Sequence, residues 1–407
     1  MTELNYKCFP ISYKKNELYI DGYSCSKLAK IYGTPLYCYS ISSVENSFRI
    51  LKKSFDKLSP LICYAVKANF NSLLIRQLSR LGSGTDVVSI GELKQSLKNG
   101  IKPENIVFSG VGKTSQEIIF AIKKKIRFIN IESEEELDEI NEIASKENKT
   151  VNILVRINPN VDAGTHEKIS TGRIEDKFGV SKKRVIEIFE KFRSSPFVNI
   201  KGLSIHIGSQ IQSLVPFKKA FEEVRELIIE LRSLQFEIKT VDIGGGIGID
   251  YGKNKTLSIE KYAKLVEKIF LDLGVEIILE PGRLLVGNSG IIISKVIRIK
   301  KGEGKNFLII DCGMNNILRP SLYNAFHDIK PVISNSQISK ANFDIVGPIC
   351  ESSDIFLKNY KIQRNICRDD LVVICSTGAY GFCMASNYNL REEAKEIFVK
   401  NGKLLKL

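Results

Sequence analysis

The stretch LICYAVKANFNSLLIRQLSRL, residues 61–81, decides the fold. Leu61 to Val66 is a short apolar run of strand length, and Lys67 stands at its end. From Asn71 to Leu81 the apolar residues recur three and four positions apart, which is the spacing of an amphipathic helix. The stretch therefore predicts a strand followed by a helix, and a repeat of this unit along the chain indicates a parallel sheet.

The same unit recurs between residues 60 and 280, which predicts an α/β fold. About eight units over this length fit a (β/α)8 TIM barrel, whose reactive residues gather at the C-terminal strand ends. After Leu61 to Val66, strands are expected at Asp86 to Ser89, Ile106 to Ser109, Phe128 to Ile131, Val151 to Ile157, Leu203 to Ile207, Val241 to Ile243 and Ile277 to Leu279. Helices are expected at Asn71 to Leu81, Glu92 to Lys98, Ser115 to Lys125, Glu134 to Lys146, Lys182 to Phe192, Phe217 to Leu234 and Ser258 to Leu273.

Beyond Gly282 the helical spacing largely disappears. Runs separated by Gly, Pro and Asn turns predict strands at Gly290 to Ile299, Phe307 to Asp311, Phe343 to Val346 and Leu371 to Cys375. Glu17 to Ser40 also has the pattern of strand and turn, so it is expected to join a second, mainly β domain of Greek-key or β-sandwich type. The predicted domains are an N-terminal segment of the β domain at 1–38, the barrel at 39–283 and the C-terminal β domain at 284–407.

Composition excludes several functional classes. No run of about 18 uncharged apolar residues and no secretory pattern is present, which predicts a cytoplasmic protein that does not act on membranes. The nine cysteines form no CxxC pair, so reduced thiols are expected. The net charge of +14 is spread along the chain, which disfavours nucleic-acid binding. His166, His206 and His327 form no metal-binding pattern, so no metal is expected.

Several residues at strand ends could carry chemistry, although each has an ordinary alternative. Lys67 could be a nucleophilic amine, if its surroundings lower its pKa, or a solvated surface charge. The triple glycine Gly244 to Gly246 could turn its N–H groups toward a phosphate or form a tight turn. Glu280-Pro281-Gly282-Arg283 could hold a pyridine nitrogen or form a surface ion pair.

Three further residues leave the same choice open. His206, with Ser209 close behind it in the sequence, could stack on a planar cofactor or be a satisfied core histidine. Cys350 could donate a proton or be a buried, inert thiol. Tyr380 could reach a phosphate with its hydroxyl or be a core aromatic on a glycine-flanked bend.

The order and spacing of these pieces resemble the fold type III, alanine-racemase-like decarboxylases that use pyridoxal phosphate (PLP). The similarity spans about Ile31 to Asn389, and it is closest to the branch that acts on diaminopimelate. It rests on the passages Tyr64-Ala65-Val66-Lys67-Ala68-Asn69, Gly82-Ser83-Gly84-Thr85-Asp86-Val87-Val88-Ser89, Phe108-Ser109-Gly110-Val111-Gly112-Lys113-Thr114, Arg156-Ile157-Asn158-Pro159, Lys177-Phe178-Gly179, His206-Ile207-Gly208-Ser209-Gln210, Glu280-Pro281-Gly282-Arg283, Cys350-Glu351-Ser352 and Gly378-Ala379-Tyr380-Gly381.

The resemblance implies a role for each candidate. Lys67 would form the Schiff base with pyridoxal 5'-phosphate, His206 would stack on its ring and Glu280 would pair with its pyridine nitrogen. Cys350 would be the proton donor and Glu351 would bind a substrate amino group. The residues implied to bind the cofactor phosphate or its surroundings are Ser209, Gly244, Gly245, Gly246, Gly282, Arg283 and Tyr380, and those implied to bind the substrate are Arg283, Arg319, Tyr323, Glu351 and Tyr380.

The implied reaction is decarboxylation of meso-2,6-diaminopimelate to L-lysine and CO2, the last step of lysine biosynthesis by that route. Arg283 and Arg319 suit a distal carboxylate better than the ammonium group of ornithine. The alternatives are an ornithine- or arginine-type decarboxylase of the same fold, or a PLP-binding regulatory protein without turnover. The family pattern further implies a homodimer with Cys350 and Glu351 offered across the interface. Ser204 stands where the family often has a histidine, which puts only a secondary pocket contact in doubt.

Overall fold

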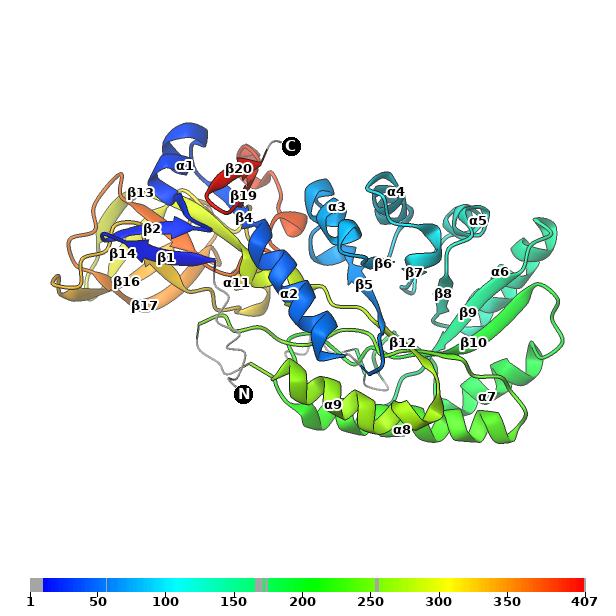
Figure 1. The fold of residues 1–407 in the computed structure, drawn as a ribbon. Coiled ribbons are helices and arrows are strands. Elements are labelled where there is room, and N and C mark those ends of the chain that lie inside the picture. Colours follow the sequence, from blue (N-terminus) through cyan, green and yellow to red (C-terminus); the bar gives the residue numbers. More distant parts are fainter. Residues whose placement is uncertain (1–9, 56, 165–170, 173–174, 253–255, 406–407) are drawn as a thin grey trace. The chain divides into compact units, whose positions relative to one another are not determined.

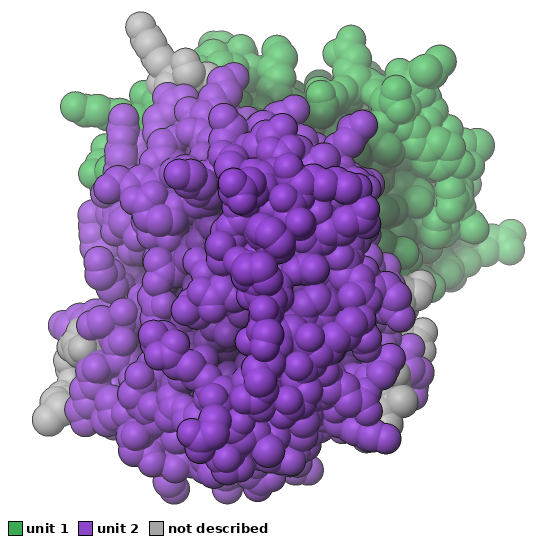
Figure 2. Space-filling view, turned by 90° about the vertical axis from the view of Figure 1, so that its right-hand side faces the viewer, with its two compact units in different colours: residues 1–47, 249–255, 283–407 green, residues 48–248, 256–282 purple. Residues whose placement is uncertain are grey.

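The computed structural model describes residues 10–55, 57–164, 171–172, 175–252 and 256–405. The chain forms two compact units, which Figure 2 colours green and purple. The β unit comprises residues 1–47, 249–255 and 283–407, and the barrel unit comprises residues 48–248 and 256–282. Each unit is thus assembled from segments that are distant in the sequence.

The barrel unit contains a closed barrel of eight parallel strands, which confirms the predicted fold class (Figure 1). The strands follow one another around the barrel in chain order, and the last strand pairs with the first. They are β5 (Leu61–Ala65), β6 (Gly84–Val87), β7 (Ile106–Phe108), β8 (Phe128–Ile131), β9 (Val151–Arg156), β10 (Val198–Ser204), β11 (Thr240–Asp242) and β12 (Glu276–Leu279).

Two barrel strands begin clearly earlier than their sequence patterns indicate: β6 begins at Gly84 and not at Asp86, and β10 shows the larger difference. The expected strand started at Leu203, whereas β10 begins at Val198 and its pairing with β9 shifts register between Ile200 and Gly202. The polar residues Asn199 and Lys201 interrupt the apolar run, so the hydrophobic pattern marked only the buried end of the strand.

Helices follow the barrel strands, and six of them begin at a serine or threonine whose side chain caps the first turn. The capping residues are Ser89, Thr114, Ser133, Ser181, Ser213 and Ser258. The helices are α3 (Ser72–Arg80), α4 (Ile90–Lys98), α5 (Ser115–Lys124), α6 (Glu134–Lys146), α7 (Lys182–Lys191), α8 (Leu214–Ser233) and α9 (Ile259–Phe270), and α2 (Ile41–Ser54) precedes β5. In the described part of the chain, no helix combines the length and apolar character needed to cross a bilayer.

The interior of the barrel changes from apolar to polar along the strands. An apolar cluster is formed by Cys63, Val107, Phe128, Leu154 and Ile278. Nearer the C-terminal strand ends the buried residues are polar, namely Asp86, Ser109, Asn130, Asp242 and Glu280. Burying several polar groups costs free energy unless they are hydrogen-bonded or charge-compensated. Their presence at this end of the barrel therefore indicates a functional site.

The β unit is mainly β, as predicted. Its nine-stranded sheet is organised around β13, which pairs with three neighbours including the N-terminal strand β4. The sheet contains β4 (Leu36–Ser40), β13 (Gly290–Lys301), β14 (Asn306–Ile310), β15 (Ile329–Pro331), β16 (Lys340–Val346), β17 (Ile355–Gln363), β18 (Leu371–Ile374), β19 (Lys395–Lys400) and β20 (Lys403–Leu405). A three-stranded sheet contains β1 (Ile11–Lys14), β2 (Glu17–Ile20) and β3 (Tyr23–Ser24).

The N-terminal stretch differs from the prediction in one respect. Glu17 to Ser40 had the pattern of strand and turn throughout, but it contains the helix α1 (Cys25–Tyr32). Ser24 caps this helix by accepting a hydrogen bond from the N–H of Lys27, and Cys25 and Leu28 bury its inner face. The cap and the three-residue apolar spacing decide the helix, which is too short to give a clear periodic signal. Two short helices, α10 (Arg283–Val286) and α11 (Arg319–Tyr323), also lie in the β unit.

A glycine substitution tests the register of β10. A Cβ atom at Gly202 would lie 1.8 Å from the carbonyl oxygen of Thr240 in β11, so Gly202→Ala must displace one of the two strands. We expect a loss of about 1–3 kcal/mol in the free energy of unfolding, measured by urea titration. Gly112→Ala is the matched control, because no atom lies within 4 Å of a Cβ placed there. Equal stability of the two variants would contradict the close strand contact.

Candidate active site

Lys67 lies on the single turn η1 (Val66–Ala68), directly after the first barrel strand. Its Nζ atom is 2.5 Å from Oδ2 of Asp86, which is fully buried at the end of β6. The pairing follows from barrel closure, because Ala65 of β5 and Asp86 of β6 are partners in register. The charged partner of the lysine at this distance is therefore a carboxylate. A neighbouring cation, which is one way to activate an amine as a nucleophile, is not what the lysine contacts here.

Two more carboxyl groups share this end of the barrel. Asp242 ends β11 and Glu280 follows β12, and a hydrogen bond links their side chains. Burial, opposed by that hydrogen bond, raises the pKa of Asp242 to about 6. Burial together with Asp242 and Asp86 raises the pKa of Glu280 well above its usual range. The pair therefore holds a proton in common near neutral pH.

The acid pair is fixed by neutral neighbours. The amide of Asn130 donates to Asp242 Oδ2 at 3.0 Å, and the hydroxyl of Ser109 donates to Glu280 Oε1 at 3.3 Å. Asn130 also donates to Ser109, so the side chains form one network across the barrel end. Sequence patterns missed Asp86, Asn130 and Asp242, although a polar residue within an apolar run of strand length is a signal that could have found them.

His206 is a neutral base at this end of the barrel. The N–H of Gly245 donates to its Nδ1 at 3.2 Å, so the ring proton resides on Nε2. Burial, followed by Arg156 and Lys67, lowers the pKa of the imidazole well below its usual range. The electrostatic influence of Lys67 on both His206 and Glu280 places these three predicted residues together.

Arg156, at the end of β9, positions the backbone of His206. Its guanidinium donates to the His206 carbonyl at 3.3 Å and to Oε1 of Glu132 at 2.6 Å, and the N–H of Gly179 donates to the other oxygen of Glu132. This buried ion pair was not predicted as functional, although the passages around Arg156 and Gly179 carried the family resemblance. Its hydrogen bonds satisfy both charges, which a buried ion pair requires.

The triple glycine is required by the close approach of backbone segments. A Cβ atom at Gly245 would lie 2.2 Å from the carbonyl oxygen of Glu280, and Gly244 has φ +66°. The N–H of Gly244 donates to Asp242 and that of Gly245 to His206, so both donors are satisfied within the protein. The loop after Ser209 meets the glycines through the hydrogen bond from Ile211 N–H to the Gly246 carbonyl.

A second group of predicted residues gathers in the β unit. Arg283 begins α10 and Arg319 begins α11, and their side chains are buried. Arg283 donates a hydrogen bond to the hydroxyl of Tyr251 at 2.5 Å, while the guanidinium of Arg319 lies 4.7 Å from the centre of the same ring. Burial, and the neighbouring charge of Arg283, lower the pKa of Arg319. Tyr251 was not among the predicted residues.

Tyr380 and Tyr323 belong to the same group. The guanidinium of Arg283 lies 4.8 Å from the centre of the Tyr380 ring, and Tyr323 lies one helical turn after Arg319 on α11. Tyr380 has φ +55°, a left-handed conformation that a tyrosine adopts only when its surroundings impose it. Gly381 allows this bend, since a Cβ atom there would lie 2.5 Å from the carbonyl oxygen of Thr377.

Cys350 and Glu351 lie in a separate loop of the β unit. Both are exposed, and the Cys350 N–H donates to the side chain of Asn389 at 3.0 Å. Glu351 accepts a hydrogen bond from Ser353 at 2.7 Å and interacts with Tyr388. The alternative of a buried, inert thiol is therefore excluded for Cys350.

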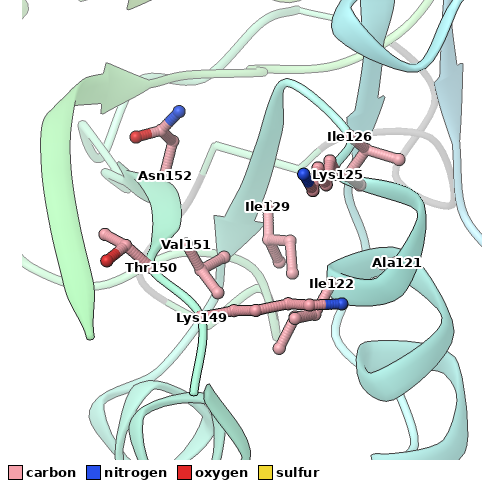
Figure 3. Close-up of a pocket in the computed structure, with 9 residues that line it drawn as sticks. All are labelled: Ala121, Ile122, Lys125, Ile126, Ile129, Lys149, Thr150, Val151 and Asn152. Atoms are coloured by element: carbon pink, nitrogen blue, oxygen red, sulfur yellow. The ribbon is translucent and has the colours of Figure 1, made fainter. Parts of the chain in front are cut away.

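A surface hollow at the other end of the barrel strands is distinct from these residues. It has a volume of about 340 Å³ and is shown in Figure 3. Its lining comes from the end of α5 and the first residues of β8 and β9, whereas Lys67 follows the last residue of its strand. Within the described part of the chain, no three His, Cys, Asp or Glu side chains cluster as metal ligands. His166, one of the histidines considered for a metal, lies outside the described residues.

The fold and the strand-end lysine agree with a family comparison. Residues 41–287 match the family described as "Pyridoxal-dependent decarboxylase, pyridoxal binding domain". The chain belongs to this family of pyridoxal-dependent decarboxylases, and its relatives assign it to the diaminopimelate decarboxylase branch, whose members are carboxy-lyases. The predicted resemblance is thereby confirmed.

Particular relatives cover nearly the whole chain. Diaminopimelate decarboxylase of Aquifex aeolicus is 43% identical over 393 residues, which are 96% of this chain and 93% of the relative. The structure of the Helicobacter pylori diaminopimelate decarboxylase in complex with L-lysine is 42% identical with a TM-score of 0.90, over 93% of this chain and 95% of that one. The enzyme from M. jannaschii, also with L-lysine, is 34% identical with a TM-score of 0.92, over 97% and 93%.

The residues present at the barrel end fit pyridoxal phosphate. Buried Oδ1 of Asp86 and Oδ1 of Asn130 have no hydrogen-bond partner among the described residues, which marks this end as incomplete without further polar groups. A lysine, a neutral imidazole and a buried acid are the groups that an aldehyde, an aromatic ring and a ring nitrogen require.

The shared proton gives a prediction for the protein freed of cofactor. The pKa of Asp242 is raised on folding, so its contribution to stability is present below about pH 4 and is lost as the pH rises through 6. We expect the difference in unfolding free energy between wild type and Asp242→Asn to decline as the pH rises from about 4 to 6 and to change little above that, because the amide does not titrate. Urea titrations over this range measure it. A difference that grows with pH would show that Asp242 is ionised in the folded protein.

Proposed function

We propose that this chain catalyses the decarboxylation of meso-2,6-diaminopimelate to L-lysine and CO2. The observation that supports this most directly is the buried pair of guanidinium groups, Arg283 and Arg319, arranged around Tyr251. A substrate with a second carboxylate suits such a pair, because a guanidinium binds a carboxylate through two parallel hydrogen bonds. An ammonium group at the same position would be repelled.

The barrel residues would hold the cofactor. Bound pyridoxal phosphate supplies an electron sink for the electron pair that remains when a carboxylate leaves as CO2. Lys67 would anchor the aldehyde, and Asp86 would hold the proton of the lysine amine at the 2.5 Å distance observed. Glu280 would face the ring nitrogen, where a positive charge restores the ionised carboxylate that burial now disfavours. His206, which is neutral, would stack on the ring without adding charge.

The phosphate would be held by groups from four segments of the chain. Because Gly244 and Gly245 already donate within the protein, we expect the N–H of Gly246 to contribute the hydrogen bond from the glycine loop. Further donors would come from Ser209 and from the Gly282 and Arg283 turn, with the hydroxyl of Tyr380. The backbone dipoles of such a loop favour an anion.

On the substrate side, Arg319, Arg283 and Tyr323 would hold the distal carboxylate, and Glu351 an amino group. Cys350 would protonate the carbon from which CO2 has left, a step for which an exposed thiol on an ordered loop is suited. These two residues would act in a homodimer, each offered to the site of the partner subunit. A cytoplasmic enzyme agrees with the eight described cysteines, which are all free thiols.

The substrate assignment is tested by CO2 release. Purified protein with pyridoxal phosphate is incubated separately with diaminopimelate, ornithine and arginine, and only diaminopimelate should yield CO2, with lysine as the second product. Arg319→Leu should raise the KM for diaminopimelate about 10- to 100-fold, since charge-assisted hydrogen bonds are lost. Release from ornithine or arginine would favour the rival decarboxylase, and cofactor binding without any turnover would favour the regulatory alternative.

The dimer is tested by mixing two inactive variants. Lys67→Ala lacks the cofactor anchor and Cys350→Ala lacks the proton donor, and the latter should lower kcat by about 10²- to 10⁴-fold. If each site combines Lys67 of one subunit with Cys350 of the other, mixed dimers contain one intact site, and random exchange should restore about a quarter of wild-type activity. Failure to restore activity in subunits shown to exchange would contradict a shared site.

A further inference from the structure

His327 is a buried histidine that the family resemblance gave no role. It is 1% exposed, in the segment that follows α11 of the β unit. Its Nε2 atom lies 2.7 Å from Nη1 of Arg319, and its Nδ1 atom lies 2.8 Å from the carbonyl oxygen of Cys375. The imidazole therefore joins a proposed substrate-binding arginine to the backbone at the end of β18.

These two partners determine which nitrogen of the ring carries the proton. A guanidinium can only donate and a carbonyl oxygen can only accept, so Nδ1 donates to Cys375 while Nε2 accepts from Arg319. Burial, followed by the charge of Arg319, lowers the pKa of His327 to about 3. The ring therefore remains a neutral hydrogen-bond acceptor toward the arginine at physiological pH.

Tyr251 holds the arginine from a second direction. Its ring packs edge-on against His327, with the ring centres 5.0 Å apart, and the guanidinium of Arg319 lies 4.7 Å from the centre of the tyrosine ring. The buried Nε of Arg319 has no hydrogen-bond partner among the described residues. The guanidinium is thus held by a hydrogen bond from one direction and by an aromatic face from another.

We propose that His327 is a positioning residue for substrate selection, which fixes the Arg319 guanidinium in the orientation that receives the distal carboxylate of the substrate. The inference rests on the proposed function, because that carboxylate belongs to diaminopimelate. Arg283 and Arg319 carry like charges in a buried region, where their repulsion is weakly screened. The hydrogen bond to His327 opposes the reorientation of Arg319 that this repulsion favours. The arginine side chain therefore loses less conformational entropy when the substrate binds.

The proposal predicts a specific separation of kinetic effects. His327→Phe retains a ring of similar size but has no acceptor, so we expect KM for diaminopimelate to rise about 10- to 100-fold. The kcat value and the affinity for pyridoxal phosphate should change much less, because the lost interaction concerns binding remote from the reacting carbon. His327→Asn is the matched control, since its amide can accept from Arg319 and donate to Cys375, and it should restore most of the lost KM.

The outcomes separate this inference from the proposed function. If wild type releases no CO2 from diaminopimelate, the function itself fails. If wild type is active and His327→Phe has an unchanged KM, or if His327→Asn is as impaired as His327→Phe, the positioning role fails.

A spectroscopic test observes the imidazole in the wild-type enzyme and needs one folded variant only for the assignment. The sequence has only three histidines, so ¹⁵N-histidine NMR of the wild-type enzyme can resolve each imidazole, with His327→Asn assigning one of them by its absence. We expect His327 to be neutral, with its proton on Nδ1, across the pH range of activity. A proton on Nε2, or a doubly protonated ring, would overturn the proposal.

Discussion

Three carboxyl groups, Asp86, Asp242 and Glu280, are buried at one end of a closed barrel together with Lys67, and the electrostatic cost of this arrangement constrains the rest of the site. Carboxylates removed from water repel one another unless a cation or a proton compensates them. Lys67 compensates Asp86 at 2.5 Å, and a shared proton compensates Asp242 and Glu280. In the proposed site, that proton could pass from the carboxyl pair to the ring nitrogen of the cofactor, which would then supply the compensating positive charge.

The neighbouring residues make this cluster rigid without adding charge to it. Asn130 and Ser109 hold the acids through neutral hydrogen bonds, and the N–H groups of two glycines bind to Asp242 and His206. The partners come from the ends of β7, β8, β10, β11 and β12, so the network depends on the barrel being closed in the correct register. A carboxyl group with a raised pKa beside a lysine in an enzyme is a recognised mark of a functional site.

Whereas the barrel end buries mainly carboxyl groups, the β unit buries positive charges. There two guanidinium groups are buried, and the described groups that contact them are tyrosine rings, a hydroxyl and an imidazole. Aromatic faces and neutral acceptors stabilise a cation while leaving its charge available to an anionic ligand. The buried acids of the barrel suit a cofactor with a basic ring nitrogen. The buried arginines of the β unit suit a substrate with an additional carboxylate.

The sequence by itself determined the fold class, and it singled out the candidate reactive residues. Alternating apolar runs and amphipathic stretches gave the barrel strands, because strand and helix periodicities are local properties of the chain. Lys67 and Glu280 were singled out because each stands directly after such a run, and His206 because it lies near the end of one. The short helix α1 and the early start of β10 were missed, since a cap and a bulge carry little periodic signal.

Only the tertiary structure decided which of these residues meet. Asp86 pairs with Lys67 because their strands are neighbours in register, and Asp242 meets Glu280 for the same reason. Tyr251 joins Arg319 and His327 although it lies in a distant stretch of the chain. Hydrogen bonds between distant segments depend on strand order and packing, and the local pattern of side chains contains neither. The partners that determine the charge and the orientation of each site residue therefore become visible only in the tertiary structure.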